Sequence, residues 1–108
     1  MKYEAARQLA LSLPEATAEP HSDWTSFKVR GKRFASAPPD GLHMHVFVDP
    51  HEAHARADQD PEAFAVIHHG PLVLGVRVTL AKVRAAELEE LLTMSWKRKA
   101  PKGLSAPR

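Results

Sequence analysis

Four segments of the chain alternate apolar and polar side chains, and this period of two constrains the fold more than any other feature. The segments are residues 24–30, 33–37, 42–48 and 72–80. Such alternation is typical of strands that bury one face and leave the other open. Turn residues separate the first three segments, because glycine stands at position 31 and Pro-Pro-Asp-Gly at 38–41. The sequence therefore predicts an antiparallel sheet of about four or five strands.

Helical spacing of apolar residues marks both ends of the chain, over residues 2–13 and 83–98. In the middle, Asp49 and Pro50 supply an N-cap and a first-turn proline for a short helix that should end near Asp58. We expect loops and short turns over the segments 15–23, 60–64 and 68–71. The helices would be packed on one face of the sheet, which gives a two-layer α+β fold.

Length and composition predict one domain in a reducing compartment. The chain has 108 residues, enough for a single core, and we expect a domain over 1–104 and a mobile basic tail over 105–108. The lack of cysteine excludes disulfides and thiol nucleophiles. Glu4 and Arg7 interrupt the apolar residues near the N-terminus, and no apolar run is long enough to span a membrane. The expectation is a cytoplasmic protein with no membrane partner.

The order of these segments resembles the MmcQ/YjbR family over about Tyr3 to Leu104. The most specific parts are FKVRGKRFA in the first hairpin and the closing W-K-x-x-A-P-K, supported by HVFVDPHEA and LGVRVTL. The resemblance implies a two-layer fold of the secretion-chaperone-like type and a DNA-binding role through a double-wing arrangement. It carries over no catalytic residue. The chain departs from the family's pattern at two positions, Val76, where members commonly have tryptophan, and Arg84, where they commonly have aspartate. Because of the second departure, we expect the N-cap of the last helix to be missing.

If the strands pair in register, the outward face of the sheet carries cations beside aromatic rings. The side chains expected there are Trp24, Lys28, Arg30, His43, His45, Phe47 and Arg77. Cations neutralise phosphates and rings stack on bases, so this pattern indicates a nucleic-acid surface. An exposed aromatic patch equally indicates protein association, in which Trp24 and Phe47 would meet a partner or a second copy of the chain.

Basic residues crowd into two further segments, although the net charge is only +2. One is the first hairpin, with Lys28, Arg30, Lys32 and Arg33; the other is the C-terminal segment, with Lys97, Arg98, Lys99 and Lys102. The two segments would act as wings that contact phosphates. The alternative is that a charged hairpin protects the sheet edge from pairing with another chain. That alternative leaves the C-terminal cluster unexplained.

Seven histidines suggest a metal site, for which His43 and His45 on one strand face are weak candidates. Motifs for phosphate loops, dinucleotide binding or a serine nucleophile are absent from the sequence. We therefore expect no cofactor, no catalytic residue and a non-enzymatic binding domain with DNA as the leading partner. The alternative is a protein-interaction or chaperone-like module that uses the same face. A homodimer formed through this face is one version of that alternative. A small-ligand protein is the third hypothesis.

Overall fold

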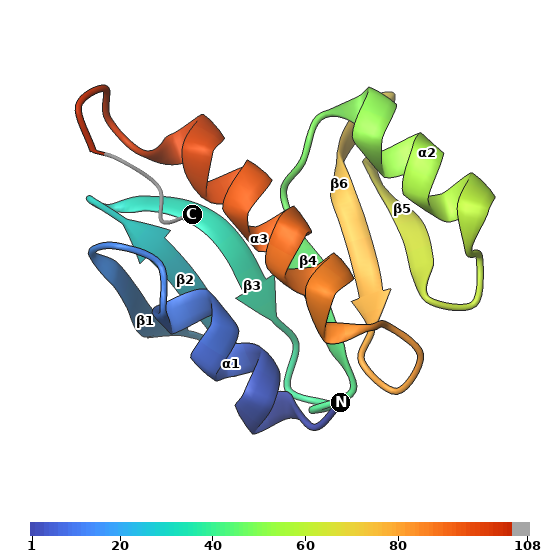
Figure 1. Cartoon of the computed structure of the whole chain (residues 1–108), viewed down its shortest axis with the longest axis horizontal. Coiled ribbons are helices and arrows are strands. Elements are labelled where there is room, and N and C mark those ends of the chain that lie inside the picture. Colours follow the sequence, from blue (N-terminus) through green and yellow to red (C-terminus); the bar gives the residue numbers. More distant parts are fainter. Residues whose placement is uncertain (105–108) are drawn as a thin grey trace.

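The computed structural model describes residues 1–104, and the predicted tail at 105–108 lies outside this range. Three helices and six strands follow one another along the chain (Figure 1). Their bounds are α1 Tyr3–Leu11, β1 Ala16–His21, β2 Trp24–Val29, β3 Lys32–Ala37, β4 His43–Val46, α2 Pro50–Gln59, β5 Phe64–His69, β6 Leu72–Thr79 and α3 Ala85–Lys99. None of these helices is long and apolar enough to cross a membrane.

All six strands form one antiparallel sheet in the order β1-β2-β3-β4-β6-β5. The three helices pack on one face of this sheet, with α3 lying across its middle, α1 toward β1 and β2, and α2 over β5 and β6 (Figure 1). The predicted two-layer α+β architecture is confirmed. The strand count is corrected from four or five to six.

Two strands lie where loops and turns were predicted. β1 contains Pro20 and is mostly exposed, so it lacks the apolar alternation of a half-buried strand. β5 occupies the predicted turn and the histidine loop, and its residues Ala65 to Ile67 are half-buried on both sides. Each is an edge strand with a single neighbour, and edge strands commonly carry proline or charged residues that interrupt the apolar alternation.

The turn between β2 and β3 lies one residue earlier in the sequence than the predicted Gly31-Lys32 turn. Arg30 and Gly31 form it, with φ values of 50° and 80°, whereas Lys32 already belongs to β3. Two successive positive φ values are typical of the type I′ turn that fits the twist of a hairpin. Arg30 is therefore a turn residue and not, as predicted, a member of the strand.

The core lies between the sheet and the helices and is formed mainly by the predicted apolar faces. Phe27, Val46 and Val76 are fully buried on the helix-facing side, and Trp96 of α3 is 1% exposed. The indole nitrogen of Trp96 donates to the carbonyl oxygen of Pro14 at 3.0 Å, which ties α3 to the loop after α1. The Ser95 hydroxyl donates to the buried carbonyl of Phe34. These two bonds fix α3 over the sheet.

Both later helices begin with side-chain caps. Asp49 accepts from the backbone nitrogen of Glu52 at 2.8 Å, as predicted for α2, although this helix continues to Gln59. At α3, Glu87 accepts from the backbone nitrogen and from the guanidinium of Arg84, both at 3.3 Å. Arg84 was expected to leave this helix without a cap, and Glu87 supplies the missing interaction from inside the first turn.

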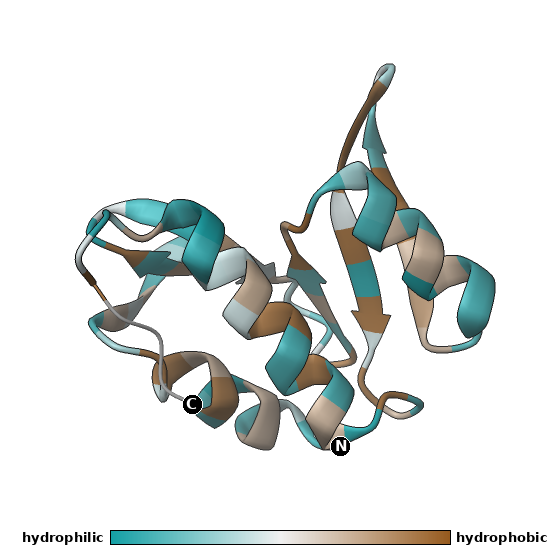
Figure 2. Ribbon diagram, turned by 45° about the horizontal axis from the view of Figure 1, so that its top comes forward, coloured by the Kyte–Doolittle hydropathy of each residue, from teal (hydrophilic) through white to brown (hydrophobic). Residues whose placement is uncertain are grey.

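The beginning of β6 departs from the predicted alternation. Leu72 and Leu74 were assigned to the core side but are 60% and 39% exposed. The pairing with β5 shifts register between Ile67 and His68, which is a β-bulge that turns this end of the strand. The β5–β6 hairpin also projects beyond the helices (Figure 2), so none of the three described helices covers the two leucines.

Candidate nucleic-acid interface

The face of the sheet opposite the helices carries a row of polar side chains. Ser26, Ser36, His45 and Arg77 lie directly opposite one another on β2, β3, β4 and β6. Opposite residues of an antiparallel pair point to the same side. The ring of Trp24 meets His45 edge-on, with 5.1 Å between the centroids. The expectation that Trp24, His45 and Arg77 share one face is therefore confirmed, and we call these three residues the open-face cluster.

Burial in the open-face cluster favours the neutral form of its histidine. His45 is half-buried, and burial lowers its pKa, with the neighbouring charges of Arg77 and His43 acting in the same direction. His43 lies one pleat away, and its Nδ1 is 2.7 Å from Oδ2 of Asp40. Asp40 accepts two further bonds from backbone nitrogens of the turn, and these, together with His43, hold the pKa of its carboxyl below the usual value. Arg77 is thus the permanent cation of the open-face cluster.

Two of the four hairpin cations, Lys28 and Arg30, are each paired with an acid in β1 or directly before it. Nζ of Lys28 lies 2.9 Å from a carboxylate oxygen of Glu19. Arg30 donates twice to Glu15, with the Nη2–Oε2 bond at 2.8 Å, and this contact lowers the pKa of Glu15. Both acids were predicted to lie in a loop, so these ion pairs were not predicted. Lys28 and Arg30 offer less free charge to a polyanion than their number suggests.

The beginning of β3 and the end of α3 together form a second cluster. Lys32 and Arg33 of the hairpin line one pocket with Arg98 and Lys99 of the helix. We call it the basic pocket; its volume is about 480 Å³ and its remaining lining residues are Phe47, Val73 and Leu74. No lining residue is acidic, and within residues 1–104 no carboxylate forms an ion pair with any of the four cations. The two predicted wings therefore meet at one place.

Phe47 organises the two arginines of the basic pocket. The guanidinium carbon of Arg33 lies 5.2 Å from the centroid of the Phe47 ring, within the range of a cation–π contact. Arg98 donates through Nη1 to the carbonyl oxygen of Phe47 at 2.6 Å. Phe47 follows directly after β4, two residues beyond His45, so strand β4 links the open-face cluster to the basic pocket.

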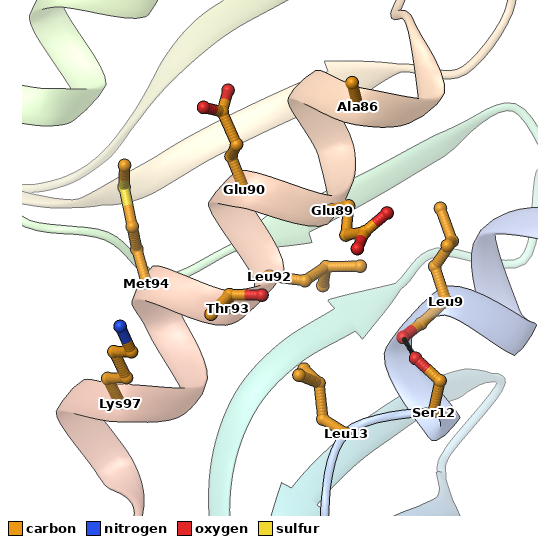
Figure 3. Close-up of a pocket in the computed structure, with 10 residues that line it drawn as sticks. All are labelled: Leu9, Ser12, Leu13, Ala86, Glu89, Glu90, Leu92, Thr93, Met94 and Lys97. Carbon is orange, nitrogen blue, oxygen red and sulfur yellow. Dashed lines mark hydrogen bonds between the residues drawn. The ribbon is translucent and has the colours of Figure 1, made fainter. Parts of the chain in front are cut away.

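Two predicted basic residues lie elsewhere. Lys97 lines a separate groove of about 690 Å³ between α1 and α3, together with Glu89 and Glu90 (Figure 3). Lys102 is exposed in the turn that follows α3. The structure thus divides the predicted interface into the basic pocket, the open-face cluster and these more distant cations. Val73 and Leu74, which form the apolar wall of the pocket, were not predicted, because sequence alternation assigned them to a regular strand.

The weak metal candidates gain no further donor. Among residues 1–104, no group of three or more histidine, aspartate and glutamate side chains is placed to hold a metal ion. His43 is engaged with Asp40 and His45 with the Trp24 ring. Two imidazoles on one strand fall short of the three or four ligands of a zinc site.

Comparisons with known proteins agree with the architecture. A family model described as YjbR matches residues 11–98. The fold is similar to that of a Deinococcus radiodurans protein, DR2400, whose crystal structure contains a DUF419 domain: the TM-score is 0.70, the identity is 24%, and the match covers 92% of this chain and 91% of that one. A search of curated proteins gave no match. Since the family model covers most of the domain, the chain belongs to the YjbR family.

Proposed function

We propose that the chain is a non-enzymatic, cytoplasmic DNA-binding domain that holds the phosphate backbone at the basic pocket. The single observation that supports this most strongly is the meeting of Lys32 and Arg33 with Arg98 and Lys99. These pairs are far apart in the sequence, and no acidic residue among 1–104 lines the pocket to offset their charge. A concentration of unopposed cations is what phosphate binding requires, since each neutralised phosphate releases bound counterions.

The open-face cluster extends this surface. Arg77 is exposed, and Trp24 and the neutral His45 lie next to it on the same face. Flat rings beside a cation suit the sugar and base of a nucleotide whose phosphate is held nearby. The basic pocket would provide affinity without reading bases, because contacts to phosphates position a nucleic acid and carry no sequence information directly.

A matched pair of variants tests this proposal. The first replaces Lys32, Arg33, Arg98 and Lys99 with glutamine, which removes the four cations of the basic pocket. The control replaces Arg7, Lys28, Arg30 and Arg84 with glutamine; each of these also loses one positive charge, but each is already paired with a carboxylate. Net charge changes equally in both.

Binding is measured by fluorescence anisotropy with labelled DNA at low salt. We expect the pocket variant to lose roughly 10- to 100-fold in affinity and the control variant to lose less than about threefold. Equal losses in both variants would show that only net charge matters and would overturn the proposal. Circular dichroism of both variants checks that the fold is retained.

Protein association at the projecting β5–β6 hairpin is the second candidate. Leu72 and Leu74 are exposed large apolar residues of this hairpin, and Leu74 also lines the basic pocket. Exposed apolar residues that lie together are typical of interaction sites. Sedimentation at increasing protein concentration, with Leu72→Ser as the comparison, tests a homodimer: self-association that Leu72→Ser abolishes, in a chain that binds no DNA, would favour this candidate.

A further inference from the structure

The basic pocket has two kinds of wall, which a simple phosphate-backbone contact does not need. Four cations form one part, whereas Phe47, Val73 and Leu74 form an apolar part. The volume of about 480 Å³ lies within the range of sites for small organic ligands, and is far more than a single phosphate group occupies. A ligand that uses the whole pocket therefore has an anionic end attached to a flat or apolar body.

The charge of the cationic part favours a doubly charged anion. A phosphate inside a DNA strand is a diester with one negative charge, whereas a terminal phosphomonoester carries roughly 1.5 to 2 negative charges near pH 7. The second negative charge should strengthen binding more in a pocket with four cations and no lining acid than at a shallow surface contact. The helix dipole explains Arg98 and Lys99 at the end of α3, but it does not explain why Lys32 and Arg33 join them from β3.

Both arginines are held in position before any ligand arrives. Arg33 lies over the Phe47 ring. Arg98 donates from Nη1 to the Phe47 carbonyl, and its other guanidinium nitrogens remain available to donate to a ligand. The planar donor groups of arginine match the oxygens of a phosphate in pairs. Fixing these groups in advance reduces the ordering that binding would otherwise require.

We infer that the basic pocket binds the terminal phosphomonoester of a DNA strand, with the attached nucleotide lying against Phe47, Val73 and Leu74. This inference rests on the proposed DNA binding and narrows it, because it makes the end of a strand the preferred target. A free nucleoside monophosphate presents the same chemistry and should occupy the same pocket more weakly, since the open-face cluster then contacts nothing.

The test uses one single-stranded oligonucleotide with an internal fluorophore in three forms, with a phosphate at the 5′ end, at the 3′ end, or at neither. We expect one phosphorylated form to bind roughly tenfold more tightly than the unphosphorylated form. Equal binding of all three forms, with affinity that still falls with salt, would overturn the end preference and leave the proposed DNA binding in place. Binding of none of the forms would refute both.

Competition identifies which part of the pocket is used. Thymidine monophosphate should displace the phosphorylated oligonucleotide at lower concentration than inorganic phosphate or thymidine does. Inorganic phosphate competing as well as the nucleotide would overturn the role of the apolar wall.

The end preference should disappear in Arg33→Gln/Arg98→Gln and weaken in Lys32→Gln/Lys99→Gln, which leaves both Phe47 contacts intact. It should persist in the control Lys28→Gln/Arg30→Gln, and its loss there would contradict the inference.

Discussion

Gly75 of β6 lies directly against the backbone of Val46 and Phe47, and its replacement by alanine should be strongly destabilising. A Cβ atom at this position would lie 2.1 Å from the carbonyl oxygen of Val46 and 2.8 Å from the Cα of Phe47. Ordinary contact begins at 3.4 Å, so relief requires a movement of about 1.3 Å (3.4 minus 2.1). Both obstacles are backbone atoms, and therefore no side-chain rotation can provide the room.

The cost of Gly75→Ala follows from what this movement disrupts. Separating the strands breaks about two ladder hydrogen bonds near the Val46–Val76 pair, at about 1 kcal/mol each, and overpacking adds roughly 1–3 kcal/mol. The total is roughly 3–5 kcal/mol, a large part of the 5–15 kcal/mol that stabilises a typical domain. In a domain of this size it corresponds to a fall in Tm on the order of 15–25 °C.

Urea denaturation and thermal melting of Gly75→Ala measure this cost, with Gly31→Ala as the control. Gly31 has a φ of +80°, but nothing lies within 4 Å of its Cβ position. Its replacement should therefore cost only the backbone strain of about 1–2 kcal/mol. A Gly75→Ala variant as stable as Gly31→Ala would refute the close approach of β4 and β6, and with it the register that places His45 opposite Arg77.

Two further perturbations test the core and the open face. Trp96→Phe removes the indole donor to the Pro14 carbonyl and leaves a void in the core, so the free energy of unfolding should fall by about 2–3 kcal/mol; an unchanged urea midpoint would contradict the contact. His45 has a pKa below its ordinary value of about 6.5, so the unfolded chain takes up its proton first as the pH falls. Stability should therefore decrease as the pH falls through about 6.5, and should level off below the folded-state pKa. His45→Gln should flatten this part of the Tm–pH profile, and the same slope in wild type and variant would show that His45 is not the residue responsible.

Most of the fold could be predicted because its central elements carry strong patterns. Alternation identified β2, β3, β4 and β6, and apolar spacing identified α1 and α3. The two edge strands lacked such patterns. Pro20 and the exposed polar residues around it make β1 resemble a loop, and β5 is half-buried on both sides, so its apolar residues do not alternate with polar ones.

The missed strands also explain what could not be predicted of the site. Once β1 is read as a loop, nothing indicates that Glu19 reaches Lys28 or that Glu15 reaches Arg30. Sequence identified both basic segments but not their meeting, which depends on how α3 crosses the sheet. The pocket wall at Leu74 depends on the bulge in the β5–β6 pairing, and a bulge leaves no clear mark in the alternation of a single strand.

The salt dependence of DNA affinity tests most directly whether the basic pocket holds phosphates. For duplex DNA, the slope of log K against log salt concentration is about −0.9 per neutralised phosphate. Replacing Lys32, Arg33, Arg98 and Lys99 with glutamine should make this slope shallower by roughly 2–4, since each lost cation removes up to one phosphate contact, while the charge-matched control keeps the wild-type slope. Identical slopes for the wild type and the pocket variant would contradict the account, because they would place every phosphate contact elsewhere on the molecule.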